Sequence, residues 1–248
     1  MNIESVCREV RENGACHVSS FLSQDRLEEI EREYDSLFSL IPDFHEAHLN
    51  ENENENGPRG SLILESAANY KSGKHLRVSP NAYSAIPSLI TIFNTQDFKS
   101  LVDMYLGTPN EFCMQIFMSN EFKVIEEGSF YRNQYLHFDP YASLKFFLYL
   151  SDTDDTTGAT FYIPGSRETG KHYREHRLDL NDSTGLYGGT RHRLEDYPGP
   201  VPYSKKDAVP ILGKKGDLLI LDTDTLHYGG VLKAPSNRKV IILHNRPA

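Results

Sequence analysis

The sequence contains no tryptophan, only three cysteines and no long run of apolar residues. Cys7, Cys16 and Cys113 are odd in number and scattered, which argues against a disulfide framework and favours reduced thiols in a cytoplasmic protein. No apolar stretch approaches the roughly 20 residues of a membrane-spanning helix, and the chain opens without the apolar segment of a signal peptide. We therefore expect a cytoplasmic protein with no membrane partner.

Positive charge is also scarce. Lysine and arginine number 26 against 35 acidic residues, so the net charge is −9 at pH 7. A nucleic-acid partner requires a clustered basic face that can neutralise phosphates, and the sequence has no such cluster. The charge balance argues against nucleic-acid binding and leaves a small-molecule substrate as the expected partner. The sequence does not decide between a monomer and a homodimer.

At 248 residues the chain is long enough for one sizeable domain. Because tryptophan is absent, the 13 Phe and 14 Tyr residues must fill much of the interior. We expect a helical layer over residues 1–110, which includes a mobile loop rich in Asn and Glu at residues 42–60. Residues 111–248 should form a strand-rich core with a polar insertion at 166–206, which is too long for an ordinary connection.

Helical spacing of apolar residues predicts four helices in the first part. One is expected at residues 3–13, where Gly14 is a typical stop signal. A second should begin after Ser23 and bury one stripe, formed by Leu27, Ile30, Tyr34, Leu37 and Phe38. Two more are expected near residues 88–93 and 96–106. These helices should pack against the outside of a sheet.

The second part shows the two-residue alternation and the turn signals of short strands. About eight strands are expected, which include those at residues 112–118, 134–137, 143–150, 159–163, 209–212, 217–221 and 239–244. The fold class is therefore mainly β with flanking helices.

Residues that can bind a metal lie at the ends of two of these strands. His137 and Asp139 stand where the strand at 134–137 gives way to a turn, and His227 follows the strand at 217–221. Two imidazoles and one carboxylate on one face of an octahedron leave the other face open, which is typical of non-haem Fe(II) oxygenases and not of closed zinc sites. His-x-Asp alone is weak evidence, because a buried histidine often pairs with an aspartate without any metal.

Arg238 lies eleven residues after His227, at the start of the last expected strand. Its guanidinium can clamp a carboxylate through two parallel hydrogen bonds. A surface ion pair is the alternative for an arginine at this place. The conjunction of His137-x-Asp139, His227 and Arg238 is much more specific than any one of its members.

This set is similar to that of the iron- and 2-oxoglutarate-dependent oxygenases, and the whole chain resembles the phytanoyl-CoA dioxygenase family among them. The supporting motifs lie at residues 12–14, 21–23, 147–152, 157–158, 163–166 and 216–219. The resemblance implies a double-stranded β-helix, a cupin-like jelly roll, braced by the N-terminal helices and with metal ligands on its second and seventh strands.

The resemblance also implies a role for each of these four residues. His137, Asp139 and His227 are expected to bind Fe(II), and Arg238 to bind the distal carboxylate of 2-oxoglutarate, which is the cosubstrate used with O2. Relatives that halogenate have a small residue in place of the carboxylate. Because Asp139 is retained, oxygenation is favoured over halogenation.

Further contacts to the cosubstrate are expected from neighbouring positions. The resemblance places Phe147 against 2-oxoglutarate, although packing in the core explains this residue nearly as well. Gln134, three residues before the first ligand, is expected to contact substrate or cosubstrate. Strand alternation puts Lys145, Phe147 and Tyr149 on one face. Whether Lys145 or Arg77 touches 2-oxoglutarate stays open.

The polar insertion departs from the family pattern, because Arg167 stands where the family usually has histidine. With further basic residues it suggests a polar or anionic substrate, although a solvated surface is the alternative; these residues are Arg132, Arg174, Arg191 and Arg193. His172 and His176 are four apart but lack the intervening catalytic Glu of a metalloprotease. We interpret them as part of a solvated or substrate-facing segment.

The expected reaction is hydroxylation of an unactivated C–H bond of a small polar molecule, with release of succinate and CO2. The same cofactor chemistry can end in desaturation, cyclisation or epimerisation, and the sequence does not separate these outcomes. A non-catalytic jelly-roll binding protein and a cupin-like metalloenzyme that does not use 2-oxoglutarate are the remaining alternatives.

Overall fold

The computed structural model describes residues 1–39, 62–63, 73–78, 80–107, 112–122, 124, 134–139, 141–177, 194 and 201–247. The strands in these residues form one sheet of seven strands and one of three. Their order is β1-β8-β5-β10-β4-β3-β2 in the larger sheet and β7-β6-β9 in the smaller. Every pairing of these strands is antiparallel, and most join segments far apart in the sequence.

The larger sheet consists of β1 (Ala15–Val18), β8 (Leu218–Asp222), β5 (Leu144–Tyr149), β10 (Arg238–Pro247), β4 (Phe112–Glu121), β3 (Gly73–Val78) and β2 (Leu62–Ile63). The smaller sheet consists of β7 (Val209–Ile211), β6 (Thr160–Tyr162) and β9 (His227–Gly229). The α-helices are α1 (Ile3–Asn13), α2 (Gln24–Ser39), α3 (Pro87–Phe93), α4 (Gln96–Leu106) and α5 (Arg167–Arg177). Two short 3-10 helices cover Pro80–Ala85 and Lys205–Asp207.

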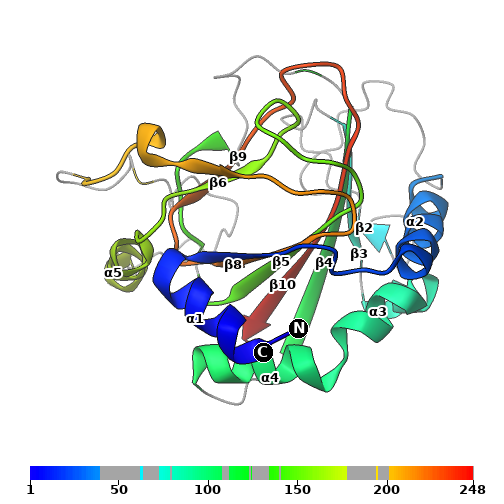
Figure 1. Cartoon of the computed structure of the whole chain (residues 1–248), viewed down its shortest axis with the longest axis horizontal. Helices are drawn as coiled ribbons and strands as arrows, with labels where there is room; N and C mark the ends of the chain where they lie inside the picture. Colours follow the sequence, from blue (N-terminus) through cyan, green and yellow to red (C-terminus); the bar gives the residue numbers. More distant parts are fainter. Residues whose placement is uncertain are drawn as a thin grey trace.

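Helices cover one face of the larger sheet, and the smaller sheet lies over the other (Figure 1). Phe93 of α3 and Phe98 of α4 pack on Phe146 of β5, with ring centroids 6.2 and 5.3 Å apart. Such aromatic contacts bury a large apolar area. The tryptophan-free core is therefore closed by phenylalanines, in the layer between the helices and the sheet.

Strand β5 separates the two sides of the core. Phe146 and Leu148 belong to the cluster under the helices, whereas Phe147 and Tyr149 pack between the sheets with Ile211 of β7. This follows from the alternation of side chains along a strand. The six residues of β5 are all buried, because apolar layers cover both of its faces.

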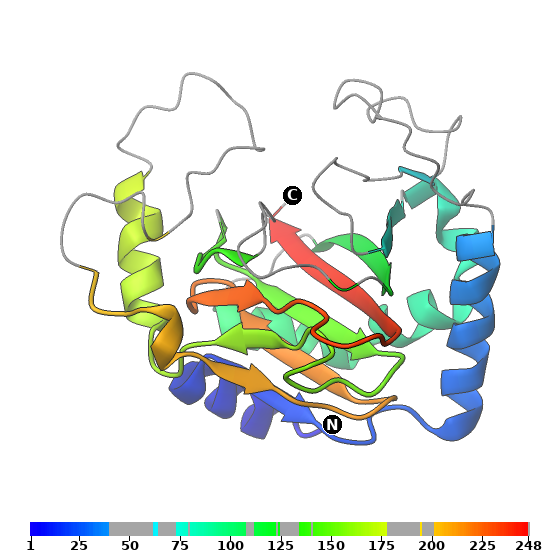
Figure 2. The same ribbon diagram turned by 90° about the horizontal axis from the view of Figure 1, so that it is seen from above.

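Two helices stand at opposite ends of the sheets. Seen from above, α5 lies at one end and α2 at the other (Figure 2). Helix α2 buries the stripe predicted from its spacing, and Tyr34 within it donates a hydrogen bond of 2.6 Å to the carbonyl of Ser119 on β4. Helix α5 begins directly after the Pro164-Gly165 turn and occupies the first part of the polar insertion.

The prediction of a mainly β fold braced by helices is confirmed, and the helices at residues 3–13 and 96–106 have the expected bounds. The strand expected at residues 134–137 is wrong: only His137 pairs, through one isolated bridge to His227. The two histidines therefore lie on a single bridge and at the start of β9, and not at the ends of two full strands. The loop expected at 42–60 lies outside the described residues.

The polar insertion expected at residues 166–206 begins with a helix, since the eleven residues that follow Ser166 form α5. None of the helices in the described part of the chain has both the length and the apolar character needed to cross a membrane.

Candidate metal centre

His137, Asp139 and His227 come together, with one potential ligand atom from each lying within 4.8 Å of the others. Their backbones hold this arrangement. His137 and His227 exchange both amide-to-carbonyl hydrogen bonds, at 3.0 and 2.8 Å, and the amide of Asp139 donates to the carbonyl of Thr223 at 2.9 Å. The turn before β9 thus fixes the residues that the sequence predicted as metal ligands.

Each imidazole is oriented by its own chain. Nδ1 of His137 lies 2.7 Å from the carbonyl oxygen of Tyr135, and Nδ1 of His227 lies 2.7 Å from that of Thr225. A carbonyl oxygen only accepts, so the proton must sit on Nδ1 and the lone pair of Nε2 is left for a metal. In metal-binding histidines, the ring nitrogen that does not bind the metal usually donates a hydrogen bond in this way.

Charge in the cluster suits metal binding. Burial, followed by the charge of Lys145, lowers the pKa of His137 and holds that of His227 well below the ordinary value. Burial acts to raise the pKa of Asp139, but the Lys145 ammonium and the nearby imidazoles outweigh it and keep that pKa far below its usual range. Neutral imidazoles and an ionised carboxylate are the forms that bind a divalent cation, and this donor set fits Fe(II).

Lys145 is the residue of this site that sequence reasoning left unassigned. Its Nζ lies 2.6 Å from Oδ2 of Asp139 and 3.2 Å from Nε2 of His227. Strand alternation placed Lys145 on the face of Phe147, and the structure bears that out. No signal in the sequence showed that the ammonium reaches the metal-binding side chains, because the contact brings β5 together with Asp139 and with His227 of β9.

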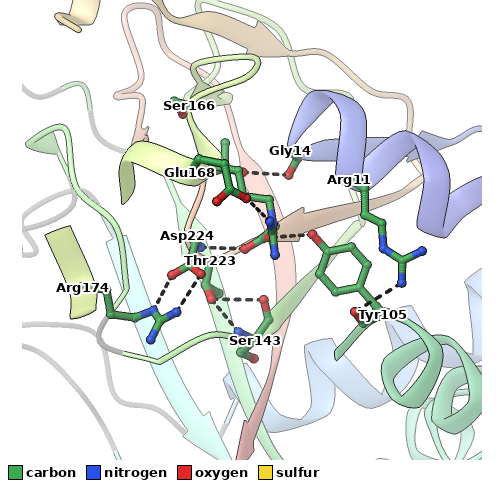
Figure 3. Close-up of polar contacts among 12 residues, drawn as sticks. Arg11, Gly14, Tyr105, Ser143, Ser166, Glu168, Arg174, Thr223 and Asp224 are labelled. Carbon is green, nitrogen blue, oxygen red and sulfur yellow. Dashed lines mark hydrogen bonds and ion pairs between the residues drawn. The ribbon is translucent and has the colours of Figure 1, made fainter. Parts of the chain in front are cut away.

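The turn between β8 and β9 is clamped by α5. Arg174 binds Asp224 through two hydrogen bonds of 2.5 and 3.0 Å (Figure 3). Arg167 donates from Nε to Asp222 at 2.6 Å. The suggestion that these two arginines face an anionic substrate is therefore wrong, because both are bound to carboxylates of the protein. Arg132, Arg191 and Arg193 lie outside the described residues.

The same turn is supported from α1 and α4. The carbonyl oxygen of Gly14 accepts from the amide of Asp222 at 2.9 Å and from Oγ1 of Thr225 at 3.3 Å, and Tyr105 of α4 donates to Asp222 (Figure 3). Gly14 has φ +89, and a Cβ there would overlap the Thr225 side chain. Three helices thus hold the short turn that leads to His227.

Phe138, between the two ligand candidates, packs into a cluster of its own with Leu136 and Leu226. Its ring stacks on Tyr173 of α5, with centroids 6.4 Å apart. His172, which the sequence grouped with His176, is exposed, and the side chain of His176 lies outside the described residues. Helix α5 therefore supports the centre through Tyr173 and its arginines.

Gly170 of α5 allows the close approach of the helix to the turn. A Cβ at this position would overlap the carbonyl oxygen of Asp224 and lie 3.4 Å from Cβ of Phe138. We expect Gly170→Ala to displace α5 and to weaken metal binding at least about tenfold, as loss of a supporting contact does elsewhere. Titration with Co(II) and a thermal melt measure the two effects. Alanine would otherwise favour a helix by about 1 kcal/mol.

Lys171→Ala is the matched control, because it changes the adjacent residue of the same helix on a partly exposed face. It should leave the affinity for Co(II) unchanged. If Gly170→Ala bound Co(II) as tightly as the unaltered protein, the helix would have no part in holding the centre.

Arg238 is the first residue of β10 and is buried, with 6% of its surface exposed. Its Nη1 lies 3.3 Å from Oε2 of Glu121, which is its cross-strand partner on β4. Within the described part of the chain, its Nε has no hydrogen-bond partner. A buried donor of this kind is costly unless a ligand satisfies it. That Arg238 binds a carboxylate is still a prediction, and the buried Nε donor supports it.

Gln134 and Phe147, the other residues predicted to touch cosubstrate or substrate, are both buried. Gln134 is buried, and its Nε2 has no hydrogen-bond partner among the described residues. Phe147 is 5% exposed and pairs in register with Ile242 of β10 and Leu219 of β8. This position of Phe147 is compatible both with simple packing in the core and with contact to a cosubstrate. The side chain of Arg77 lies outside the described residues.

Comparison with known proteins identifies the family. The sequence model of the phytanoyl-CoA dioxygenase family matches residues 10–240, which is nearly the whole chain. The chain belongs to the phytanoyl-CoA dioxygenase family. The family recognised from the motifs of the sequence is therefore confirmed.

A relative from rice agrees with the family assignment. Phytanoyl-CoA dioxygenase 1 of Oryza sativa subsp. japonica is 30% identical over 112 residues, which cover 45% of this chain and 36% of the rice protein. The match thus spans little more than a third of that relative's length.

Solved structures agree on the fold. The epimerase SnoN, in complex with Fe3+, α-ketoglutarate and nogalamycin RO, superposes with a TM-score of 0.60 at 15% identity, over 99% of this chain and 84% of SnoN. The carbocyclase SnoK from nogalamycin biosynthesis gives 0.57 at 13% identity, over 99% and 84%. These likenesses show a common fold, which is the jelly roll expected from the sequence.

Proposed function

We propose that the protein is an Fe(II)- and 2-oxoglutarate-dependent dioxygenase that hydroxylates a C–H bond of a small polar molecule, with release of succinate and CO2. The observation that carries the proposal is the pair of histidines whose Nδ1 atoms are held by backbone carbonyls, which leaves each Nε2 to bind a metal in a cluster with the Asp139 carboxylate. His137, Asp139 and His227 would hold the iron. When bound, the iron activates O2 at the expense of 2-oxoglutarate.

The chain's own residues bind and orient the reactants. Arg238 would clamp the distal carboxylate of 2-oxoglutarate, because its Nε has no hydrogen-bond partner among the described residues while Nη1 stays on Glu121. Phe147, Tyr149 and Leu219 form an apolar wall between the sheets and exclude water from the cosubstrate. The unused Nε2 of Gln134 is suited to a polar group of the substrate.

The outcome of the reaction has a second candidate. The names of two neighbours in fold, an epimerase and a carbocyclase, support the possibility that the same cofactor chemistry rearranges or closes a ring instead of adding a hydroxyl group. The roles of the protein residues in holding metal and cosubstrate are the same in each case. What differs is the fate of the substrate after hydrogen is removed.

Succinate release triggered by a substrate is the experiment that tests the function. Candidate polar molecules are screened with Fe(II), O2 and 2-oxoglutarate, and the product of an active molecule is analysed by mass. Gain of one oxygen supports hydroxylation, loss of two hydrogens indicates cyclisation or desaturation, and an unchanged mass indicates epimerisation. An Fe(II)-loaded protein that shows no visible charge-transfer band with 2-oxoglutarate under anaerobic conditions would overturn the proposal.

A further inference from the structure

Lys145 occupies an unusual place for an ammonium group. It is 8% exposed and lies on the inner face of β5, in register with Leu221 of β8 and His244 of β10. Its two contacts, Asp139 and His227, are two of the three residues expected to bind the metal. A buried lysine is rare unless it is paired, and here its partners are needed for another purpose.

The contact with His227 cannot survive metal binding. Nε2 of a neutral imidazole has one lone pair, and because Nδ1 carries the proton, this lone pair now accepts from Lys145. A metal that binds Nε2 must therefore displace the ammonium. The contact with Asp139 can remain, since Lys145 holds Oδ2 while Oδ1 is the oxygen that lies 3.8 Å from Nε2 of His227.

Metal loading thus leaves Lys145 with a free N–H donor in a buried place. The balance of the buried charges shows which kind of ligand can accept a hydrogen bond from this donor. Lys145 pairs with Asp139, and Arg238 pairs with Glu121, so these four charges cancel. A divalent cation and a dicarboxylate such as 2-oxoglutarate then add as a neutral pair, whereas without Lys145 the remaining three of these charges and the two ligands would sum to one excess negative charge. Uncompensated buried charge is strongly unfavourable.

We propose that Lys145 is a second basic anchor for 2-oxoglutarate: released from His227 when the metal binds, its ammonium donates to the carboxylate at the keto-acid end while it stays on Asp139. This inference rests on the proposed function and deepens it. Arg238 would hold one end of the cosubstrate and Lys145 the other. Lys145 also competes with the metal in the free protein, so its effects on the two ligands should have opposite signs.

The test is Lys145→Met, which keeps the length of the side chain and removes the charge. Co(II) should bind more tightly to this variant, because no ammonium has to leave His227. The Kd of 2-oxoglutarate should rise at least about tenfold, which is the size expected for loss of a charge-assisted hydrogen bond. Anaerobic titration of the Fe(II)-loaded protein with 2-oxoglutarate, followed by its charge-transfer band, gives the second value. A general loss of folding would weaken both.

The affinity for pyruvate distinguishes the role of Lys145 from that of Arg238, because pyruvate has the keto-acid end of 2-oxoglutarate without the distal carboxylate. Lys145→Met should weaken pyruvate and 2-oxoglutarate by a similar factor, whereas Arg238→Met should weaken 2-oxoglutarate alone. Lys239→Met is the matched control: it removes a lysine that pairs with Asp35 of α2 on the other face of the larger sheet, and it should change none of these constants.

Two results would overturn the inference while the proposed function stands. One is an unchanged Kd of 2-oxoglutarate in Lys145→Met when the unaltered protein binds it. The other is weakening of Co(II) and 2-oxoglutarate together. If the unaltered protein binds neither ligand, the proposed function fails first.

Discussion

Replacing Asp139 with alanine is expected to abolish metal binding and with it all production of succinate from 2-oxoglutarate. The carboxylate is the anionic member of the candidate centre, and the two imidazoles alone leave too few ligands for a ferrous ion. Asp139→Ala also leaves the Lys145 ammonium buried without its closest partner, which should destabilise the fold by about 3–5 kcal/mol. Co(II) titration, a thermal melt and a succinate assay measure these effects.

The double variant Asp139→Ala, Lys145→Met separates loss of the ligand from loss of stability. It removes the ammonium whose ion pair with Asp139 is lost, so the melting temperature should recover much of the difference. Succinate production should stay absent, because a metal ligand is still missing. Turnover at the unaltered rate in either variant would contradict the assignment of Asp139 to the metal.

Arg238→Met is expected to raise the concentration of 2-oxoglutarate needed for half-maximal activity by roughly 10- to 150-fold, the range for a lost hydrogen bond between charged groups. Metal affinity should be unchanged, because Arg238 is not among the residues that contact the metal-binding side chains. The substitution removes the buried ion pair of Arg238 with Glu121, so the free energy of unfolding should also fall. Activity is measured against 2-oxoglutarate at saturating Fe(II).

Glu121→Gln in the Arg238→Met background is the control for this loss. It removes the carboxylate charge that Arg238 balances in the unaltered protein, and it should restore stability while the requirement for 2-oxoglutarate stays high. If the double variant also regained its affinity for the cosubstrate, Arg238 would act only as the ion-pair partner of Glu121. The alternative role considered from the sequence, an ion pair without any cosubstrate, would then be correct, although the pair is buried and not on the surface.

Helix α5 changes the interpretation of the long polar insertion. Its arginines looked like substrate contacts in the sequence, yet Arg167 and Arg174 bind Asp222 and Asp224 beside the centre. An arginine and an aspartate that are about 50 residues apart give no sequence signal of their pairing. The first part of the insertion, helix α5, therefore contributes to positioning the turn before His227.

The sequence by itself determined the family, the helices with one apolar stripe, and the candidates His137, Asp139, His227 and Arg238. Each of these depends on local spacing: apolar residues three to four apart define a buried helix face, and metal ligands at fixed distances from predicted strands form a motif. The alternation in β5 likewise placed Phe147 and Lys145 on one face, because side chains of a strand alternate strictly.

Only the tertiary structure decided how these residues meet. The strand expected at 134–137 is a single bridge between His137 and His227, since the segment is held by β9 and by the turn at Thr223 and not by its own pattern. The contacts of Arg167 with Asp222, of Arg174 with Asp224 and of Lys145 with His227 join residues far apart along the chain and follow from the packing of separate elements. Long-range ion pairs depend on distance and burial, which no local pattern in a sequence specifies.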